Sequence, residues 1–334
     1  MTLKSMFALV ALCALAFPAF AQEEPFPAGG ITLDPAVNVE IAKQDVYLSI
    51  RKVRVTYEYR SDQAQTVTMR FVNPIVPMDG GPDHLGGLLL EDQEGHLNYT
   101  RLKITADGKT VEPEVHEYAY FMGEDITPEL MAAGVPAFID PTLPLTAILA
   151  TLDAAAKAEM VERGWLILDE AGEPSYVTWV YQTIMAWQQP LAAGTTAVEI
   201  AYEPLNGYPS GADPAYYGEG EDAAWVGQVR DFYCIDGALT RAVKKKMEKE
   251  PAFELVQLGY APSIEERART VESFTLTVDK AETAADMGGP LSFVAFCPAD
   301  ATKVGDLQFQ WAAKDYRPQD VNVAFYSFAD RFEN

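Results

Sequence analysis

Positive charge is scarce in this sequence. Its 334 residues hold 25 lysines and arginines against 49 aspartates and glutamates, and the formal net charge at pH 7 is −24. A surface this acidic repels the phosphates of nucleic acid and of anionic lipid headgroups, so neither is an expected partner. It favours cations, basic peptides or neutral ligands, and solubility alone would account for the same charge.

Long hydrophobic runs are rare as well. The one at the N-terminus follows Lys4, extends from Met6 to Phe17, and is followed by the A-x-A cleavage site Ala19-Phe20-Ala21. This arrangement is typical of a secretory signal peptide, and the apolar run is too short to span a bilayer. The sequence therefore predicts a signal over residues 1–21, cleavage near Ala21 and a soluble mature protein in the periplasm or outside the cell.

A membrane-anchored lipoprotein is the alternative interpretation of the same N-terminus. Its anchor would be Cys13, but a lipobox needs a small residue directly before the cysteine, and this sequence has Leu12 there. No later stretch is apolar for long enough to cross a bilayer. We expect no integral membrane segment in the mature chain.

Cysteine is nearly absent: there are three, and Cys13 lies in the predicted signal. Cys234 follows an apolar, strand-like run, and Cys297 ends another. Exported proteins fold in an oxidising compartment, where an even number of cysteines is expected to pair. We predict a Cys234–Cys297 disulfide and no free thiol.

Recognised catalytic and cofactor motifs are missing. The sequence contains neither G-x-S-x-G nor H-E-x-x-H. The segment 218–223 fits G-x-G-x-x-A, but no strand leads directly into it and its three carboxylates would repel a pyrophosphate. We therefore expect no cofactor.

Histidine is equally scarce, with three in the whole chain. A zinc site built from His84, His96, Asp79 and Asp83 is conceivable, because imidazole and carboxylate groups are zinc ligands. Their spacing matches no known ligand pattern, and a solvated loop with scattered histidines is the other interpretation. No metal site is predicted.

Alternating apolar residues dominate what is present. Val53, Val55, Tyr57 and Tyr59 would share one face of a strand, and similar patterns recur to the C-terminus. We predict a mainly β protein of antiparallel, β-sandwich-like lobes with a helical insertion. The predicted units are the signal 1–21, an N-terminal β lobe 22–126, the helical insertion 127–165, and a C-terminal β lobe 166–334 with one helix.

An irregular stretch between residues 206 and 225 combines aromatic and acidic side chains. Rings beside carboxylates can hold a sugar or a cationic side chain, although the rings could equally cover the edge of a sheet. The candidate binding surface is Tyr208, Asp213, Tyr216, Tyr217, Glu219, Glu221, Asp222 and Trp225.

Several short motifs in order along the chain resemble an exported bacterial family, domain of unknown function 4424. They are Gly29-Gly30, Asp45 and Ser49, the segments 123–127 and 134–136, Trp187-Gln188-Gln189, Tyr202-Glu203-Pro204, Tyr233-Cys234-Ile235-Asp236, Phe274-Thr275-Leu276, Cys297 and Asp315-Tyr316-Arg317-Pro318. The segment 73–77 departs from the family's proline-flanked apolar segment. The resemblance implies export and the paired cysteines, and it implies no activity.

Two classes of function are compatible with these features. The first is a non-enzymatic envelope protein that binds a partner protein, a cationic peptide or a glycan, or that has a structural role. The second is a hydrolase of envelope polysaccharide, because glycoside hydrolysis requires only two suitably placed carboxyl groups. The missing motifs favour the first class, and no catalytic residue is assigned.

The candidate binding surface can be tested directly. Replacing Tyr216, Tyr217 and Trp225 with alanine should leave the fold intact and remove any captured partner, because aromatic side chains supply contact area at low entropic cost. Circular dichroism would check the fold and a pull-down with mass spectrometry the capture. An unfolded variant would instead place the rings in the core.

Overall fold

The computed structural model describes residues 28–34, 37–78, 95–140, 143–207, 230–249, 254–281, 291–298 and 300–328. Of these residues, 49% lie in strands and 19% in helices, which confirms the mainly β prediction. Within the described ranges, no helix has the length and apolar character needed to cross a membrane.

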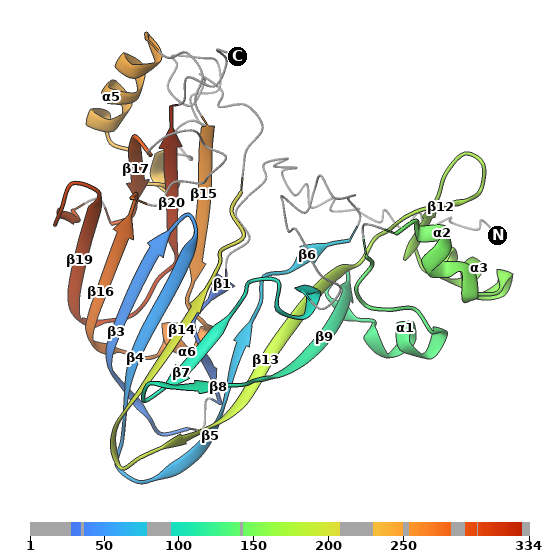
Figure 1. Ribbon diagram of the computed structural model, residues 1–334, viewed down its shortest axis with the longest axis horizontal. Coiled ribbons are helices and arrows are strands. Elements are labelled where there is room, and N and C mark those ends of the chain that lie inside the picture. The colour runs from blue at the N-terminus through green and yellow to red at the C-terminus, as the bar shows by residue number, and fades with distance from the viewer. Residues whose placement is uncertain are drawn as a thin grey trace, which may run out of the picture.

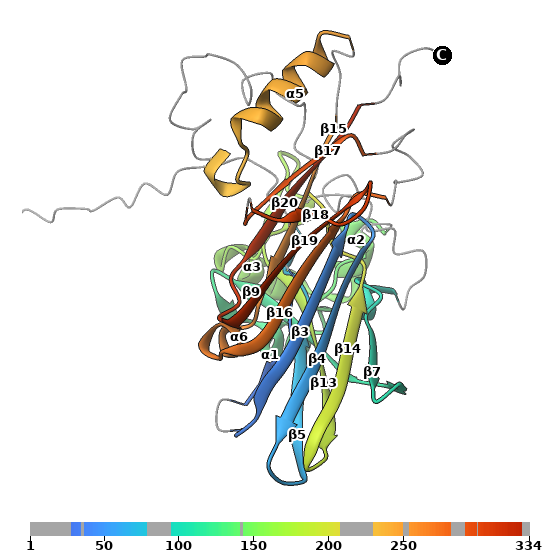
Figure 2. The ribbon, with the colours of Figure 1, turned by 90° about the vertical axis from the view of Figure 1, so that its left-hand side faces the viewer.

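The largest sheet has eight strands. In spatial order they are β18 (Thr302–Lys303), β19 (Gln308–Tyr316), β16 (Val271–Asp279), β3 (Glu40–Ser49), β4 (Lys52–Ser61), β14 (Gly194–Tyr202), β7 (Lys103–Ala106) and β8 (Lys109–Val111). All neighbours are antiparallel except β16 and β3, which run parallel. Figure 2 shows β16, β3, β4 and β14 side by side. The alternation predicted for β4 is present, because Val53, Val55, Tyr57 and Tyr59 are all buried.

Two further sheets complete the body. The six-stranded sheet has the order β10 (Glu124–Asp125), β9 (Glu114–Phe121), β13 (Val180–Leu191), β5 (Gln65–Val72) and β2 (Thr32–Leu33), with β6 (Val76–Pro77) also paired to β13. The four-stranded sheet has the order β1 (Ala28–Gly29), β15 (Glu254–Ala261), β20 (Val321–Ser327) and β17 (Phe293–Phe296). A separate antiparallel pair consists of β11 (Leu166–Leu168) and β12 (Pro174–Val177).

One hydrophobic core is shared by all three large sheets. It contains Val55 of the eight-stranded sheet, Phe71 of the six-stranded sheet and Val256 of the four-stranded sheet. The four-stranded sheet is buried on both faces: Val323 and Phe325 of β20 face this core, whereas Ala324 and Tyr326 pack in a second cluster under a helix. That double burial explains why β20 is apolar almost throughout.

The helices are short and most belong to one projecting part of the chain. They are η1 (Gly95–Asn98), α1 (Thr127–Ala133), α2 (Leu145–Ile148), η2 (Leu149–Thr151), α3 (Ala154–Glu162), α5 (Gly237–Met247) and α6 (Ile264–Ala268). We call residues 122–176 the arm. Figure 1 shows the arm on the right, away from the eight-stranded and four-stranded sheets.

The arm packs on β6, β9 and β13 through a hydrophobic cluster separate from the shared core. Leu145, Ile148, Leu149, Leu152 and Met160 recur at a spacing that would place them on one face of a single helix. All five pack in this cluster, but they come from α2, η2, α3 and the link between them. The chain leaves the helical conformation at Leu152, and the Asp153 side chain then caps α3 by accepting a hydrogen bond from the backbone of Ala156. Asp153 is a strong N-cap residue in the middle of this apolar spacing, so the chain begins a new helix there instead of continuing one long helix.

The largest sheet draws strands from both predicted β lobes. The eight-stranded sheet combines β3, β4, β7 and β8 from residues 22–126 with strands from residues 166–334. Sequence periodicity identifies strands but not their non-local neighbours, so it could not have shown this mixing. The division of the chain into domains at 22–126, 127–165 and 166–334 stays a prediction.

The predicted disulfide is present. Cys234 lies just before α5, and Cys297 directly follows β17, with 5.2 Å between their Cα atoms. The bond ties α5 to the sheet that it covers, where Val243 is completely buried.

Removing this bond should destabilise the protein. The two cysteines are 63 residues apart, and closing a loop of that length stabilises by about 4 kcal/mol in the chain-entropy model. We expect a Cys234→Ser/Cys297→Ser variant to have a free energy of unfolding, measured in urea, that is lower than the wild-type value by this order. Reductant should lower the wild-type free energy of unfolding to the same level. Two labelled thiols in the unfolded, unreduced wild type would contradict the bond.

Candidate functional site

The loop predicted as a binding surface lies outside the described residues. The range 208–229 contains all eight of its residues, so their binding role stays a prediction. Of the four residues considered for zinc, only His96 is described. Its ring stacks on Phe138 at 4.7 Å, and its Nε2 lies 3.4 Å from Oε1 of Glu117. Within the described ranges, no three potential ligands come together to form a metal site.

A buried carboxyl group forms the polar centre of the body. Glu266, on α6, is 2% exposed. Ser263 caps this helix: its Oγ accepts a hydrogen bond from the Glu266 backbone at 3.2 Å, and its own backbone N–H donates to Glu266 Oε2 at 2.7 Å. This reciprocal pair is a capping box, which here fixes the carboxyl group facing inward.

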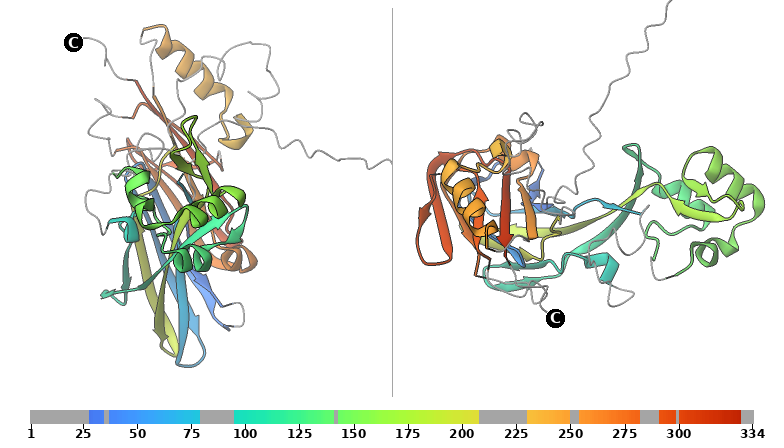
Figure 3. Two further views of the ribbon diagram at one scale, coloured as in Figure 1. Left: turned by 90° about the vertical axis from the view of Figure 1, so that its right-hand side faces the viewer. Right: turned by 90° about the horizontal axis from the view of Figure 1, so that it is seen from above.

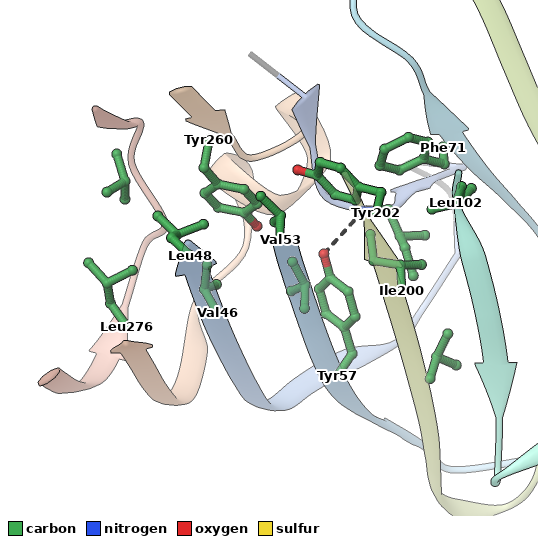
Figure 4. Packing of buried hydrophobic residues seen from close by; sticks show 14 of the residues in the cluster. Val46, Leu48, Val53, Tyr57, Phe71, Leu102, Ile200, Tyr202, Tyr260 and Leu276 are labelled. Atoms are coloured by element: carbon green, nitrogen blue, oxygen red, sulfur yellow. Dashed lines mark hydrogen bonds between the residues drawn. The ribbon is translucent and has the colours of Figure 1, made fainter. Parts of the chain in front are cut away.

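Polar side chains from neighbouring strands surround this carboxyl group. Gln44 of β3 donates from Nε2 to Glu266 Oε1 at 3.0 Å and to the Tyr260 hydroxyl at 3.2 Å. Tyr57 of β4 is also hydrogen-bonded to Glu266. Figure 4 shows that the hydroxyl groups of Tyr57, Tyr202 and Tyr260 point toward the same interior region. Gln44 therefore links the eight-stranded sheet both to the Glu266 carboxylate and, through Tyr260 of β15, to the four-stranded sheet.

Burial strongly perturbs the titration of this cluster. Loss of solvation raises the pKa of Glu266 from 4.5 to about 7, and hydrogen bonds from Tyr57, Ser263 and Gln44 offset part of that rise. Burial and the nearby Glu266 carboxylate also raise the pKa values of Tyr57 and Tyr260 well above 10. The tyrosines therefore stay neutral near pH 7, whereas Glu266 exchanges its proton there.

The N-terminal segment is held against the same centre. The Tyr57 hydroxyl accepts a hydrogen bond from the Ile31 backbone at 3.1 Å, and Ser263 Oγ donates to the Ile31 carbonyl at 3.1 Å. A Cβ atom on Gly30 would overlap the carboxylate oxygens of Glu266, and one on Gly29 would overlap the carbonyl of Ala261. The two glycines therefore allow close approach, with Gly29 in β1 beside β15.

The position of Glu266 limits its possible chemistry. A carboxyl group that titrates near neutral pH has the property needed for general acid–base catalysis. A substrate must also reach that group, however, and both oxygens of Glu266 are already hydrogen-bonded in the interior. The geometry fits a structural clamp. The hydrolase alternative, which requires a second converging carboxyl group, stays a prediction.

A second candidate lies where the six-stranded sheet meets the arm. Tyr118 and Tyr120 of β9 are partly exposed and stack at 5.9 Å. The strand registers pair Tyr120 with Val180 and with Asp125, so these side chains share one face of the sheet. We call this face, with the adjoining Met122, the hairpin surface; it consists of Tyr118, Tyr120, Met122, Asp125, Val180 and Ile184.

Met122 is the most unusual residue of the hairpin surface. It is 90% exposed, and its φ of 51° lies in the left-handed region, as does that of Gly123 at 87°. Turns of this kind favour asparagine and glycine, not an unbranched apolar side chain. Local stability favours neither the backbone angle nor the exposure of this methionine.

Exposed apolar side chains are concentrated in the arm. Of the eleven large ones among the described residues, six lie in the arm: Met122, Met131, Leu143, Val161, Leu168 and Tyr176. The arm also carries ten acidic and only two basic residues. Among them, Glu124 follows the β9–β10 turn and Glu129 lies on the first turn of α1, both exposed.

Sequence reasoning missed both of these sites. The pattern Ser263-x-x-Glu266 is a capping-box signature and could have located α6, but burial of its glutamate depends on distant strands. Met122 carries no sequence signal of its own, because its exposure and backbone angle become visible only once β9 and β10 are paired.

Comparison with known proteins gives a family and a distant structural likeness. The model of the family "Domain of unknown function (DUF4424)" matches residues 25–323. No curated protein matches the chain. A crystal structure from Legionella pneumophila, of a protein provisionally assigned as nutrient-binding, is similar at a TM-score of 0.41 and 7% identity, over 91% of this chain and 72% of that one. A likeness at this level supports no argument about function.

The raised pKa of Glu266 predicts how stability depends on pH. Between pH 4.5 and about 7 the folded state keeps a proton that the unfolded state releases, so the contribution of this group to stability falls as pH rises through that window. The full effect is about 3 kcal/mol. A Glu266→Gln variant cannot titrate, and its stability relative to wild type should rise by this order between about pH 5 and about pH 8.

Urea unfolding at several pH values would measure this difference. The variant amide can be accommodated, because Gln44 Oε1 is buried without a hydrogen-bond partner and can accept from it once the Gln44 side chain turns. Glu265→Gln, on the same helix, controls for the loss of one negative charge. If the Glu266→Gln and wild-type curves run parallel across the pH range, Glu266 is not the titrating group.

Proposed function

The chain belongs to the family "Domain of unknown function (DUF4424)", and from this premise we propose that it is an exported envelope protein that binds a partner through the hairpin surface. The partner that fits is a protein segment carrying both cationic and apolar side chains. Catalysis is not part of the proposal.

The disulfide supports the export part of the proposal. Structural disulfides persist in oxidising compartments and are rare in the bacterial cytosol. The Cys234–Cys297 bond secures α5, whose buried face completes a hydrophobic cluster, so the bond contributes to the fold and not only to a surface loop. These features fit a periplasmic or secreted protein.

Met122 is the observation that carries the binding role. An exposed methionine at a positive φ costs stability twice, once through its backbone conformation and once through its hydration. Strained residues persist where they serve a function, and methionine is common on surfaces that adapt to a partner. Binding would bury this side chain and so offset the cost of exposing it.

The surroundings of Met122 indicate the chemistry of the partner. The stacked rings of Tyr118 and Tyr120 offer flat faces to which a guanidinium or ammonium group is attracted. Asp125 shares their face, and Glu114, near the other end of β9, adds a further exposed carboxylate on that face. Apolar contact with Met122 and charge pairing at its edge together select a basic, amphipathic segment over a neutral glycan.

A Met122→Asn substitution should separate stability from binding. Asparagine tolerates a positive φ better than methionine does, so we expect a gain of about 0.5 kcal/mol or more in the free energy of unfolding. The same change removes an apolar contact worth roughly 1.5 kcal/mol when buried, which corresponds to about a tenfold loss of affinity. Urea unfolding and fluorescence anisotropy would measure the two effects.

The binding probe is a labelled peptide that alternates arginine and leucine. A glutamate–leucine peptide and a neutral oligosaccharide serve as negative probes, and affinity for the first peptide should fall with added salt. Val304→Asn is the matched control, because Val304 is 52% exposed but lies outside the arm. Equal binding by the Met122→Asn and Val304→Asn variants would overturn the role of the hairpin surface. Preference for the oligosaccharide would overturn the cationic partner.

A further inference from the structure

Helix α5 is a local concentration of positive charge on an acidic protein. Residues 237–249 contain Arg241, Lys244, Lys245, Lys246 and Lys249 against the single acidic residue Glu248. Lysines in the last turn of a helix complement its dipole, which accounts for some of these charges. It does not account for Arg241, which lies in the middle of the helix.

The two faces of α5 are clearly separated. Leu239, Val243 and Met247 pack toward the four-stranded sheet. Helical spacing places Arg241 and Lys245 on the opposite face, and both are exposed. The disulfide at Cys234 and the buried Val243 hold the helix in place, so its cationic face is presented rigidly.

An exposed aromatic side chain accompanies these charges. Phe232, two residues before Cys234, is 45% exposed and contacts Tyr233 edge-on at 4.8 Å. Cationic groups with an exposed phenyl ring are the chemical complement of the hairpin surface, which offers carboxylates, a methionine and stacked tyrosines. We call Phe232, Arg241, Lys244, Lys245 and Lys249 the α5 surface.

The two complementary surfaces cannot meet within one molecule. Figure 1 shows α5 at the upper left, beyond the four-stranded sheet, and α1 with the end of β9 on the right. The view from above in Figure 3 again places α5 and the arm at opposite ends of the molecule. Any contact between them therefore requires two copies of the chain.

We propose that the α5 surface of one copy docks on the hairpin surface of a second copy. This inference rests on the proposed function and names its partner. The two surfaces differ, so the contact is heterologous and joins copies head to tail. Such a row keeps one free α5 surface at one end and one free hairpin surface at the other, so assemblies larger than a dimer form as concentration rises.

The net charge of −24 opposes this association at long range. At physiological ionic strength, however, exposed charges separated by more than about 8 Å are largely screened. Charges that meet at the interface then decide the outcome, and there the pairing is of opposite signs. Very low salt should weaken the contact through overall repulsion, and very high salt should weaken it by screening the local pairs.

Sedimentation velocity of the chain without residues 1–21 tests the inference with two variants, each of which reverses the charges of one surface. One variant reverses the α5 surface with Arg241→Glu and Lys245→Glu. The other reverses the carboxylates on the face of Tyr118 and Tyr120 with Glu114→Lys and Asp125→Lys. Because Asp125 Oδ1 accepts a hydrogen bond from the Thr127 backbone at 2.9 Å, Glu114→Lys is also made alone. Circular dichroism checks that each variant is folded.

The expected results form a definite pattern. The wild type associates with rising concentration at physiological ionic strength and dissociates in 1 M salt, where the screening length is about 3 Å. Either variant alone loses about tenfold or more in its association constant, because like charges now face each other. An equimolar mixture of the two variants associates again, because each carries the complement of the other.

Other outcomes would overturn the inference in distinguishable ways. A wild type that stays monomeric but binds the arginine–leucine peptide refutes self-association and leaves the proposed function standing. A monomer that does not bind this peptide refutes both. Capture of the wild type, but not of the α5 variant, by vesicles of anionic phospholipid would assign the α5 surface to lipid instead. A mixture of variants that fails to associate would show that these surfaces do not meet.

Discussion

Burial of the Glu266 carboxyl group is the constraint on which the arrangement of the sheets depends. A carboxyl group in the interior is costly unless each of its oxygens is hydrogen-bonded. Its partners come from distant places: Gln44 on β3, Tyr57 on β4 and the Ser263 cap of α6. These donors reach Glu266 only in the observed register of the strands. A slip by one residue would turn Gln44 and Tyr57 away and leave the carboxyl group unsatisfied.

The same centre determines how the N-terminal segment crosses the body. Ile31 is held through its backbone by Tyr57 and Ser263, so residues 28–33 can pair with the four-stranded sheet through β1 and with the six-stranded sheet through β2. Gly30 is required because the chain passes directly over the carboxylate. One polar contact group thus connects three sheets that share a single hydrophobic core, and apolar packing alone would not specify that register.

Sequence patterns predicted features that neighbours along the chain determine and missed those that contacts between distant segments determine. The alternation of Val53 to Tyr59 identified β4, because residues two apart along a strand share a face. The mixing of early and late strands in one sheet has no local signal in the sequence, and neither has the burial of Glu266. The helix break before α3 does have a local signal, the N-cap residue Asp153, but the apolar spacing continues across the break and concealed that signal.

Charge and strain are distributed so that stability and binding rest on different parts of the molecule. The interior around Glu266 is almost fully hydrogen-bonded and packed, whereas the arm exposes apolar side chains and holds Met122 in an unfavourable turn. Proteins keep such locally unfavourable features where they serve a function, because a well-packed body supplies the stability that they cost. The arm packs in a hydrophobic cluster separate from the shared core, so its surface can change with little effect on that core. This separation makes the hairpin surface suited to recognition and the buried carboxyl group suited to holding the fold.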